Sequence, residues 1–475
     1  IALFTCLSCG NQLDIEPVDV LKTDLVFKNS TNLEAALTGA YSEIKGTFTN
    51  TLSGELYGGD FNIISELLGS DGNVTFGGTF PAYQEFDRKD VLVNNIEVAD
   101  NWARAYVACN IINNVLANVT IADTPEDQQR IEGEARCLRG MIYFEMVRLW
   151  CKPWGLGTEA TDPGIPLVLT PVNTAAQADA LKTIGRSTVQ AVYAQVIEDL
   201  TAAKTLLEPF GQNDVRASTY VAAAMLSRVY LQQSKFALAA AEADYVIKSG
   251  VFELVALPRN AFNNSANTKE DVFAIQQSAL SNAGTANSGA ATFYASLNGA
   301  GRGDMRISET YINNTFLPGD RRGGIKQGLN STSVITNVDT MFYISEYGQA
   351  LGNVFTAKYG DPNLNIPIIR LAEMYLTRAE GNIESSGSVG ATPLEDINVI
   401  RRRAGLDDLL TVDIVEIRKE RERELAFEGF KLHDLKRWKT SAIDGLPFSA
   451  DKLVLPIPER ETELYDIPQN PGYNE

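Results

Sequence analysis

Apolar residues recur at helical spacing over much of the chain. In the first such stretch, residues 31–45, the apolar positions Leu33, Leu37, Ala40 and Ile44 fall on one face behind a Ser30-Thr31-Asn32 segment that can cap a helix. The same periodicity predicts further helices at 98–115, 126–149, 187–207, 220–233, 236–249, 369–385, 393–404 and 414–438. Helices are therefore expected to dominate the fold.

Two regions interrupt this pattern. Residues 57–90 are rich in glycine, aspartate, asparagine and aromatics, and predict a loop with one short helical turn. Residues 253–364 are rich in Asn, Ser, Gly and Ala, with only short strand-like pieces such as 272–275. Long ordered loops in a compact protein are usually functional, so both regions are candidates for a binding face.

The stretches 220–233 and 236–249 form two predicted helices of nearly equal length joined by a short turn. Leu226, Ser227 and Tyr230 match the large, small and aromatic positions of a tetratricopeptide repeat, and Ala239 and Ala243 match its small positions. An unrelated helical hairpin is the alternative. The expected fold class is all-α dominated, a tetratricopeptide-like α-α superhelix scaffold with a large irregular loop-built ligand-binding region and few short strands.

Charge and histidine content exclude several function classes. The formal net charge is -19 and the sequence pI about 4.7, which repels phosphate backbones, so no nucleic-acid partner is expected. The presence of a single histidine, His433, removes most triad and zinc arrangements, and its position between Leu432 and Asp434 favours a packed structural role. We expect no cofactor and no metal; calcium at Asp71-Gly72-Asn73 is a weaker alternative because the EF-hand loop pattern is missing.

The N-terminal segment resembles the end of a secretory signal followed by a loose lipobox at Ser8-Cys9. Cys9 is the predicted lipidation site and residues 1–8 the signal remnant; acylation at Cys6, or a Cys6–Cys9 redox or metal pair, are the alternatives. Further along, no apolar run reaches the roughly 18 to 20 residues of a spanning helix. Cys109, Cys137 and Cys151 are expected to be buried thiols, with one disulfide among them left open.

Near the C-terminus, the run 416–424 alternates acidic and basic residues at i,i+3 spacing, which predicts a solvated helix held by ion pairs. This run leads into the residues that carry a family resemblance. The segments 367–380, 397–406 and 421–438, the last reading Arg-Glu-Arg-Glu-Leu-Ala-Phe-Glu-Gly-Phe-Lys-Leu-His-Asp-Leu-Lys-Arg-Trp, closely resemble the SusD/RagB family in order and spacing. Residues 13–17, 455–461 and 469–473 extend the resemblance over the whole chain, although the segment 150–155 is longer than usual.

The resemblance implies an outer-membrane lipoprotein that faces the cell exterior and touches the membrane only through its lipid anchor. It implies capture of an oligosaccharide or a peptide, delivery to a SusC-type TonB-dependent transporter, and no catalytic activity. The corresponding division is an N-terminal SusD-like region at 9–250 and a C-terminal RagB/SusD region at 251–475.

Ligand-binding candidates follow from the chemistry of sugars. Aromatic rings cover the weakly polar faces of sugar rings, and Asp, Asn and Arg satisfy the hydroxyl groups. Residues of both kinds on predicted loops are Asp71, Asn73, Phe76, Tyr83, Phe86, Trp154, Phe293, Tyr294, Asn298, Arg302 and Asp304. Trp102 and Trp150 lie on helical faces and are expected in the core.

A glycan-binding lipoprotein is the leading hypothesis. A peptide-binding member of the same family is the alternative within that class. A glycoside hydrolase that uses paired carboxylates, or an interaction scaffold that binds only its transporter, are alternatives from other classes.

Overall fold

The computed structural model describes residues 27–46, 53–209, 215–284, 287–329, 340–440, 444–465 and 467–473. Cys9 and the predicted signal remnant lie outside these residues. The helices are α2 (Ser30–Lys45), α3 (Asp60–Leu68), α4 (Pro81–Arg88), α5 (Ile96–Ala117), α6 (Pro125–Trp150), α7 (Ala175–Leu181), α8 (Val189–Leu206), α9 (Thr219–Gln232), α10 (Phe236–Lys248), α11 (Ala290–Tyr294), α12 (Glu309–Thr315), α14 (Leu371–Ser385), α15 (Pro393–Arg403), α16 (Ile414–Leu425), α17 (Lys431–Arg437) and α18 (Glu459–Tyr465).

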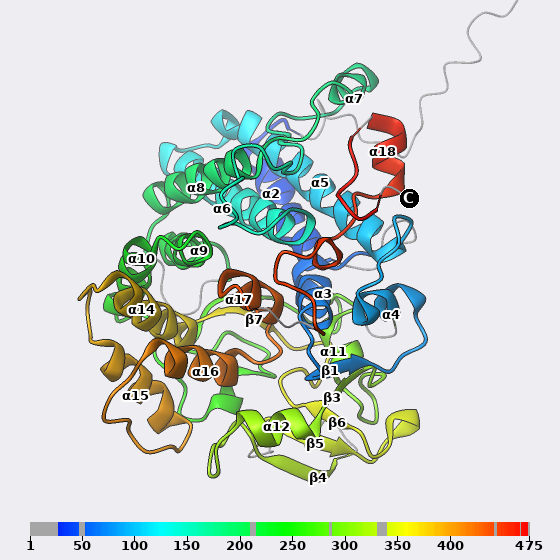
Figure 1. Cartoon of the computed structure of the whole chain (residues 1–475). Helices are drawn as coiled ribbons and strands as arrows, with labels where there is room; N and C mark the ends of the chain where they lie inside the picture. The colour runs from blue at the N-terminus through cyan, green and yellow to red at the C-terminus, as the bar shows by residue number, and fades with distance from the viewer. Residues whose placement is uncertain are drawn as a thin grey trace, which may run out of the picture.

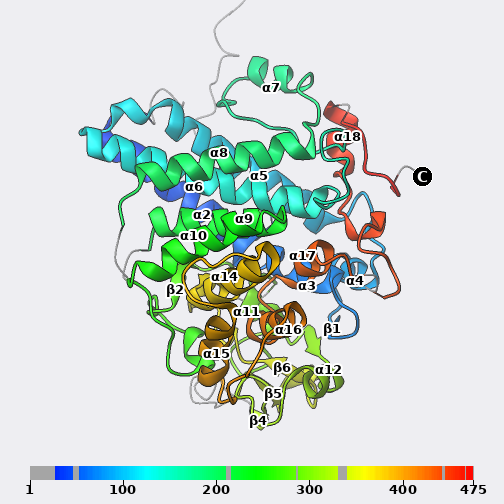
Figure 2. The same ribbon diagram turned by 60° about the vertical axis from the view of Figure 1, so that its left-hand side comes forward.

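The long helices pack as successive pairs, with α2, α5, α6 and α8 at one end and α9, α10 and α14 following them (Figure 1). Small residues make the close approaches possible. A Cβ added at Gly140 of α6 would lie 2.9 Å from Cγ of Leu200 on α8, and one at Gly381 of α14 would lie 2.7 Å from the carbonyl oxygen of Phe236 on α10. The predicted tetratricopeptide-like superhelix is confirmed, and the view in Figure 2 shows its helices running side by side.

The strands are β1 (Val74–Phe76), β2 (Asp271–Ile275), β3 (Met305–Ile307), β4 (Ile325–Leu329), β5 (Phe342–Ser345), β6 (Val354–Thr356) and β7 (Ile366–Arg370). The strands β1, β3, β6, β5 and β4 lie at the opposite end of the molecule from α7 and α8, whereas β7 lies near its middle (Figure 1). A five-stranded sheet has the order β1-β3-β6-β5-β4, and β2 pairs with β7 antiparallel in a separate ribbon. The strand expected at 272–275 is confirmed, and the region around it is irregular as predicted.

The prediction for residues 57–90 was wrong, because this stretch forms α3, β1 and α4. Helix α3 is covered on nearly every side, with Phe61, Ile64 and Leu68 all buried, so it lacks the polar face that makes a helix visible in sequence. Helix α4 begins with Pro81 at its first turn, and Lys89 ends it in the left-handed conformation.

The helix predicted over 414–438 is broken into α16 and α17. Phe427 and Gly429 have positive φ values of 62° and 81° in the connecting turn. The carbonyl of Phe427 accepts hydrogen bonds from Asn62 Nδ2 at 3.0 Å and from the Tyr359 hydroxyl at 3.0 Å. Contacts from distant parts of the chain thus hold a turn that a non-glycine residue rarely adopts.

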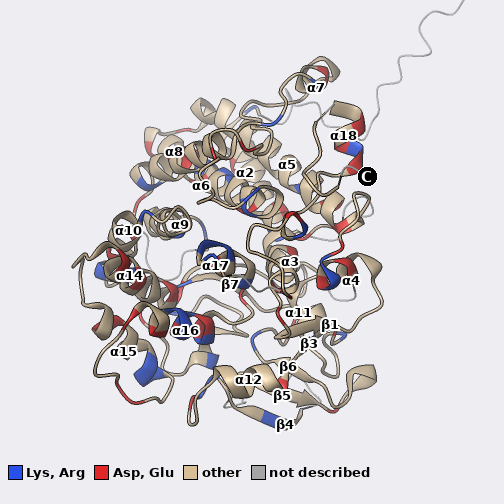
Figure 3. Ribbon diagram, in the orientation of Figure 1, with Lys and Arg blue, Asp and Glu red and all other residues tan. Residues whose placement is uncertain are grey.

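The expectation of a solvated charged helix at 416–424 was also wrong. Glu420, Arg421 and Glu424 are buried, and Glu424 lies among arginines of other elements, at 3.0 Å from Arg370 and 3.2 Å from Arg322. Figure 3 shows this mixture of acidic and basic residues around α16. Burial alone would raise the pKa of Glu424, but the guanidinium groups of Arg403, Arg370 and Arg322 hold it well below its ordinary value.

Other core predictions are confirmed. Trp102 and Trp150 are buried with ring centroids 5.7 Å apart, and Cys109, Cys137 and Cys151 are free and buried. His433 is 2% exposed, and burial lowers its pKa well below the ordinary value, with Arg148 and Lys436 acting in the same direction. Over the part of the chain that the structure describes, no helix combines the length and apolar character needed to span a bilayer.

Candidate ligand-binding site

The pairing of β1 with β3 brings together two segments that lie far apart in the sequence. Their antiparallel register matches Val74 with Ile307 and Phe76 with Met305. As a result, the aromatic residues around β1 and α4 meet Phe293 of α11. We call this group the aromatic cluster; its members are Phe76, Phe80, Tyr83, Phe86 and Phe293.

The rings of the cluster are in direct contact. Tyr83 stacks on Phe76 with centroids 5.4 Å apart and meets Phe293 at 4.6 Å, and Phe80 lies 6.5 Å from Phe293. The predicted residues Tyr83 and Phe86 belong to α4, and Phe293 and Tyr294 to α11, so the loop placement predicted for them was wrong. Tyr83 is 1% exposed and Phe293 0%, so both rings lie in the interior.

An acidic layer lies beneath the cluster. The Tyr83 hydroxyl donates to Asp60 Oδ1 at 2.7 Å, and Asn101 Nδ2 donates to Asp60 Oδ2 at 2.7 Å. Burial raises the pKa of Asp60, while the hydrogen bonds from Tyr83 and Asn101 act in the opposite direction. Asp60 and the neighbouring Glu55 are 0% and 1% exposed, which keeps both carboxyls out of reach of a surface ligand.

The outer edge of the cluster is formed by Phe80 and Arg302. The guanidinium carbon of Arg302 lies 4.2 Å from the centroid of the Phe80 ring, and both residues are partly exposed. Arg302 Nη1 donates to Asn287 Oδ1 at 3.3 Å, and Nε lies 3.3 Å from Oδ2 of the buried Asp304. A cation on an aromatic face is a rigid platform with hydrogen-bond donors at its rim.

Phe80 was missed by the sequence prediction. The sequence feature that could have identified Phe80 is its position after Gly78 and directly before Pro81. A proline at this point marks the start of a helix, so Phe80 lies at the N-terminal end of α4. A Cβ added at Gly78 would lie 2.6 Å from Cγ of Asp304. Glycine there lets the chain pass directly over Asp304, whose pKa is raised by burial and lowered by Arg302 and Arg306.

A second group of exposed residues flanks Arg302. Asn298 is exposed at the turn where Leu297 and Ala300 pair with each other. Tyr347, which the sequence prediction also missed, is 40% exposed and its carbonyl accepts from Ser296 Oγ at 3.3 Å. The hydrogen bond from Ser296 therefore joins the loop of Tyr347 to the segment that carries Asn298.

The remaining predicted residues lie elsewhere. Asp71 is exposed and lies 3.8 Å from Lys431 Nζ, whereas Asn73 is buried. Trp154 is partly buried and meets Tyr193 of α8 at 4.9 Å. Tyr294 donates to Asn62 Oδ1 at 2.8 Å and faces Tyr359. Among the described residues, no group of three or more acidic, cysteine or histidine side chains is arranged to hold a metal ion.

Two sizeable cavities, of about 470 and 340 Å³, lie away from the aromatic cluster; residues of α5 and α7 line both, and residues of α18 line the smaller one. The two cavities and the exposed contact between Arg302 and Phe80 therefore lie in different parts of the protein. The exposed edge of the aromatic cluster carries the cation and the aromatic ring of Arg302 and Phe80, whereas the walls of the 340 Å³ cavity are mainly apolar.

Two family models match the chain. The SusD family model matches residues 304–473, and a model described as starch-binding associating with outer membrane matches residues 68–231. SusD-like protein P2 of Formosa agariphila is 27% identical, and the match covers 100% of this chain and 98% of that protein. The starch-binding protein SusD of Bacteroides thetaiotaomicron is 33% identical over 126 residues, which are 24% of this chain and 22% of that protein.

Solved structures agree in fold. A SusD superfamily protein from Bacteroides thetaiotaomicron superposes with a TM-score of 0.76 at 23% identity, covering 94% of this chain and 100% of that one. A laminarin-binding SusD-like protein superposes with a TM-score of 0.72 at 22% identity, covering 94% and 100%. Helical pairs that carry a loop-built face are therefore the fold that this chain shares with these solved structures. Over the two matched segments the chain is similar to the SusD/RagB family.

Proposed function

We propose that this protein captures an oligosaccharide at the cell surface and delivers it to a SusC-type TonB-dependent outer-membrane transporter. The observation that carries the ligand site is the Arg302 guanidinium, 4.2 Å from the centroid of the Phe80 ring at the exposed edge of the aromatic cluster. The guanidinium supplies donors for sugar hydroxyls, and the exposed Asn298 and Tyr347 supply an amide and a further ring face.

The relatives support a glycan ligand. One is named a starch-binding protein and one a laminarin-binding protein. The burial of Asp60 and Glu55 also favours binding over glycoside hydrolysis, since a hydrolase needs two carboxyls that reach the glycosidic bond. Anchoring through an acylated Cys9 and an outward orientation complete the proposal.

Binding to a panel of soluble glycans and peptides, measured by calorimetry and affinity gels, tests the ligand class. We expect Phe80→Ala and Arg302→Ala each to weaken glycan binding about tenfold, equivalent to about 1.4 kcal/mol. Leu410→Ala, a change at a residue that is 92% exposed between α15 and α16, is the control and should bind as the parent does.

Unchanged glycan affinity in both Phe80→Ala and Arg302→Ala would show that the glycan does not bind at the aromatic cluster. Failure of the parent protein to bind any glycan would overturn glycan capture, and binding of peptides alone would select the peptide alternative. Co-purification with a TonB-dependent transporter from outer membranes tests delivery, and its absence under mild detergent would argue against that step.

A further inference from the structure

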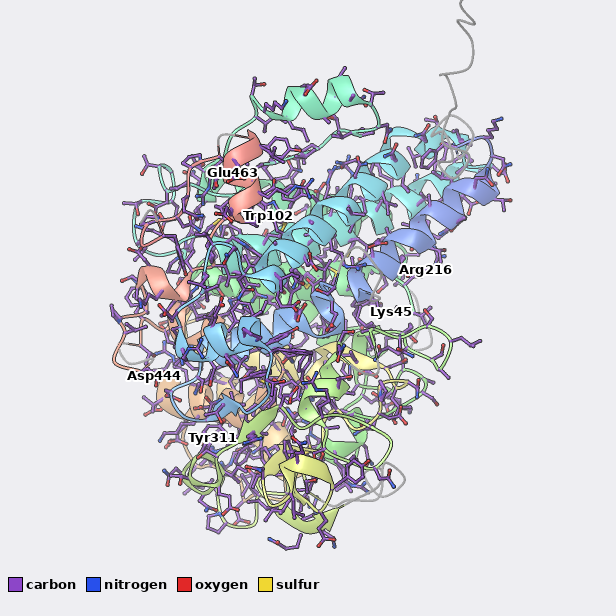
Figure 4. The ribbon with its side chains drawn as sticks, turned by 90° about the vertical axis from the view of Figure 1, so that its right-hand side faces the viewer. Lys45, Trp102, Arg216, Tyr311, Asp444 and Glu463 are labelled. Carbon is purple, nitrogen blue, oxygen red and sulfur yellow. The ribbon has the colours of Figure 1, made fainter. Side chains whose placement is uncertain are left out.

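A cavity of about 340 Å³ opens at the helical end of the molecule, away from the five-stranded sheet. It is lined by residues of α5, of α7 and the segments that flank it, and of α18, and it shares no lining residue with the aromatic cluster. Figure 4 shows Trp102 of α5 close to α18, where Glu463 is labelled. We call this cavity the α5–α7–α18 pocket. Its volume suits a small organic molecule.

The walls of the pocket are largely aliphatic and aromatic. Val107 and Ile184 are 41% and 45% exposed although both are apolar. Apolar side chains that stay accessible in a concave surface are typical of a binding site, whereas scattered ones need no explanation. The larger apolar lining residues include Trp102, Tyr106, Ile111, Leu181, Ile184 and Tyr465.

The uncharged polar groups of the pocket already have partners within the protein. Asn110 Nδ2 donates to the Val172 carbonyl at 3.0 Å, and the Val172 amide donates back to Asn110 Oδ1 at 2.8 Å. The Tyr106 hydroxyl donates to the carbonyl oxygen of Pro166 at 2.7 Å. These hydrogen bonds join α5 to the segment ahead of α7, so the groups that make them shape the pocket and leave little capacity to bind a ligand.

Glu461 of α18 is the one charged side chain among the described residues that line the pocket. Burial raises its pKa, while a hydrogen bond with the Trp102 side chain and the charge of Arg460 act in the opposite direction. Within the described chain Glu461 forms no salt bridge, and Arg460 is exposed, so water screens its charge. A carboxylate in apolar surroundings without a paired cation is costly, and a ligand that brings a positive charge would offset that cost.

Aromatic rings surround this carboxylate. Trp102, Tyr106 and Tyr465 line the same pocket, and the rings of Trp102 and Tyr106 lie with their centroids 5.2 Å apart. Burial raises the pKa of Tyr106, and the charge of Glu461 acts in the same direction, so the phenol and the carboxylate feel each other's field. Aromatic faces attract organic ammonium ions. A carboxylate and aromatic rings in one pocket therefore favour a cation over a neutral molecule or an anion.

We propose that the α5–α7–α18 pocket binds a small amphipathic organic cation. Its ammonium group meets the Glu461 carboxylate, and its apolar body fills the space beside Leu181 and Ile184. Such a ligand differs in chemistry from a sugar, and neither Phe80 nor Arg302 lines the pocket. The site is therefore additional to the proposed glycan site, and either one can fail its test without the other.

Calorimetry on the full chain near neutral pH tests the charge preference with three probes of similar size and shape. These are phenethylamine, which is protonated, phenethyl alcohol, which is neutral, and hydrocinnamate, which is an anion. We expect phenethylamine to bind at least about tenfold more tightly than phenethyl alcohol, and hydrocinnamate to bind more weakly than both. Equal affinity for the amine and the alcohol, or no binding of the amine at millimolar concentration, would overturn the proposal.

A pair of charge-removing variants assigns the preference to one carboxylate. Glu461→Gln keeps an acceptor for the Trp102 side chain but removes the charge, and it should lose the tenfold preference for the amine. Glu463→Gln removes the same charge from an exposed residue of the same helix and should keep the preference. Near-ultraviolet circular dichroism checks that both variants fold as the parent does. An equal loss in both variants, or in neither, would contradict the role of Glu461.

Crystals of the full chain soaked with para-bromophenethylamine give an independent readout of position. We expect the anomalous signal of bromine inside the α5–α7–α18 pocket, beside Leu181 and Ile184, in crystals of the parent and of Glu463→Gln. The signal should be lost in crystals of Glu461→Gln at the same soaking concentration. Bromine at the aromatic cluster, or only at scattered surface positions, would overturn the assignment of the cation to this pocket.

Discussion

The hydroxyl of Tyr83 donates a 2.7 Å hydrogen bond to Oδ1 of Asp60, whose side chain has no exposed surface. This bond joins α4, which carries the aromatic cluster, to α3, which packs in the centre of the protein. The same carboxylate accepts from the Glu55 amide at 3.0 Å and from Asn101 Nδ2 at 2.7 Å. The hydrogen-bonded carboxylate of Asp60 therefore holds Tyr83, and with it the aromatic cluster, in position against α3.

Removal of this hydroxyl should cost stability. Tyr83→Phe keeps the ring but takes one donor from a buried carboxylate, so we expect a loss of about 1–3 kcal/mol in the free energy of unfolding, measured by urea denaturation. Tyr347→Phe, at a residue that is 40% exposed, should leave stability unchanged. Equal stability of Tyr83→Phe and the parent would mean that water replaces the lost donor.

A substitution in the buried ion network around Arg370 should lower the free energy of unfolding more than Tyr83→Phe does. Arg370 is within 2.6 Å of Glu270, 3.0 Å of Glu424 and 2.7 Å of Glu428. Arg370→Met leaves these carboxylates without their shared cation, and we expect a loss of about 3–5 kcal/mol in the free energy of unfolding.

The matched control for that experiment is Arg402→Met. Arg402 pairs with Asp408 at 2.7 Å, but the two side chains are 59% and 45% exposed, so water and salt already screen the pair. This variant should unfold at the same urea concentration as the parent. A loss as large as that of Arg370→Met would contradict the assignment of stability to burial.

Glu66 should make the folded state less stable as the pH rises. Burial raises its pKa from 4.5 to about 7, against the opposing effects of Lys431 and the Gly429 amide. Between these values the folded protein keeps a proton that the unfolded chain has released, so the stabilisation present at low pH is lost as the pH approaches 7. The slope from this one group is at most about 1.4 kcal/mol per pH unit.

Urea denaturation from pH 4.5 to 7 checks this prediction. Glu66→Gln should flatten the profile relative to the parent, while Glu463→Gln, at an exposed residue of α18, should not change it. Parallel profiles for the parent and Glu66→Gln would show that Glu66 is ionised throughout this range.

Two glycine substitutions should act in opposite directions. A Cβ at Gly78 would lie 2.6 Å from Cγ of Asp304 and 2.7 Å from the Phe76 ring, so Gly78→Ala should destabilise the protein by about 1–3 kcal/mol. A Cβ at Gly39 in α2 meets nothing within 4 Å, and Gly39→Ala should stabilise by about 0.5–1 kcal/mol. Thermal denaturation measures both; the same sign for both would contradict the packing argument.

The sequence alone determined the helical scaffold and the resemblance to the SusD/RagB family. Helices with a polar face, such as α2 and α10, show their period because water covers one side of each. The segments 367–380, 397–406 and 421–438 carried the family resemblance, which the family models and relatives confirm. Four predicted residues, Phe76, Tyr83, Phe86 and Phe293, also proved to belong to one cluster.

Other features of the fold and of the candidate site depend on tertiary contacts that the sequence does not reveal. Helix α3 is covered on nearly every side and has no amphipathic signal, and the turn at Phe427 depends on Asn62 and Tyr359, which lie far away in the sequence. The charges of α16 are buried because arginines of other elements surround them. Arg302 meets Phe80 because β1 pairs with β3 and α4 follows β1, and such a meeting depends on long-range pairing that local periodicity does not encode.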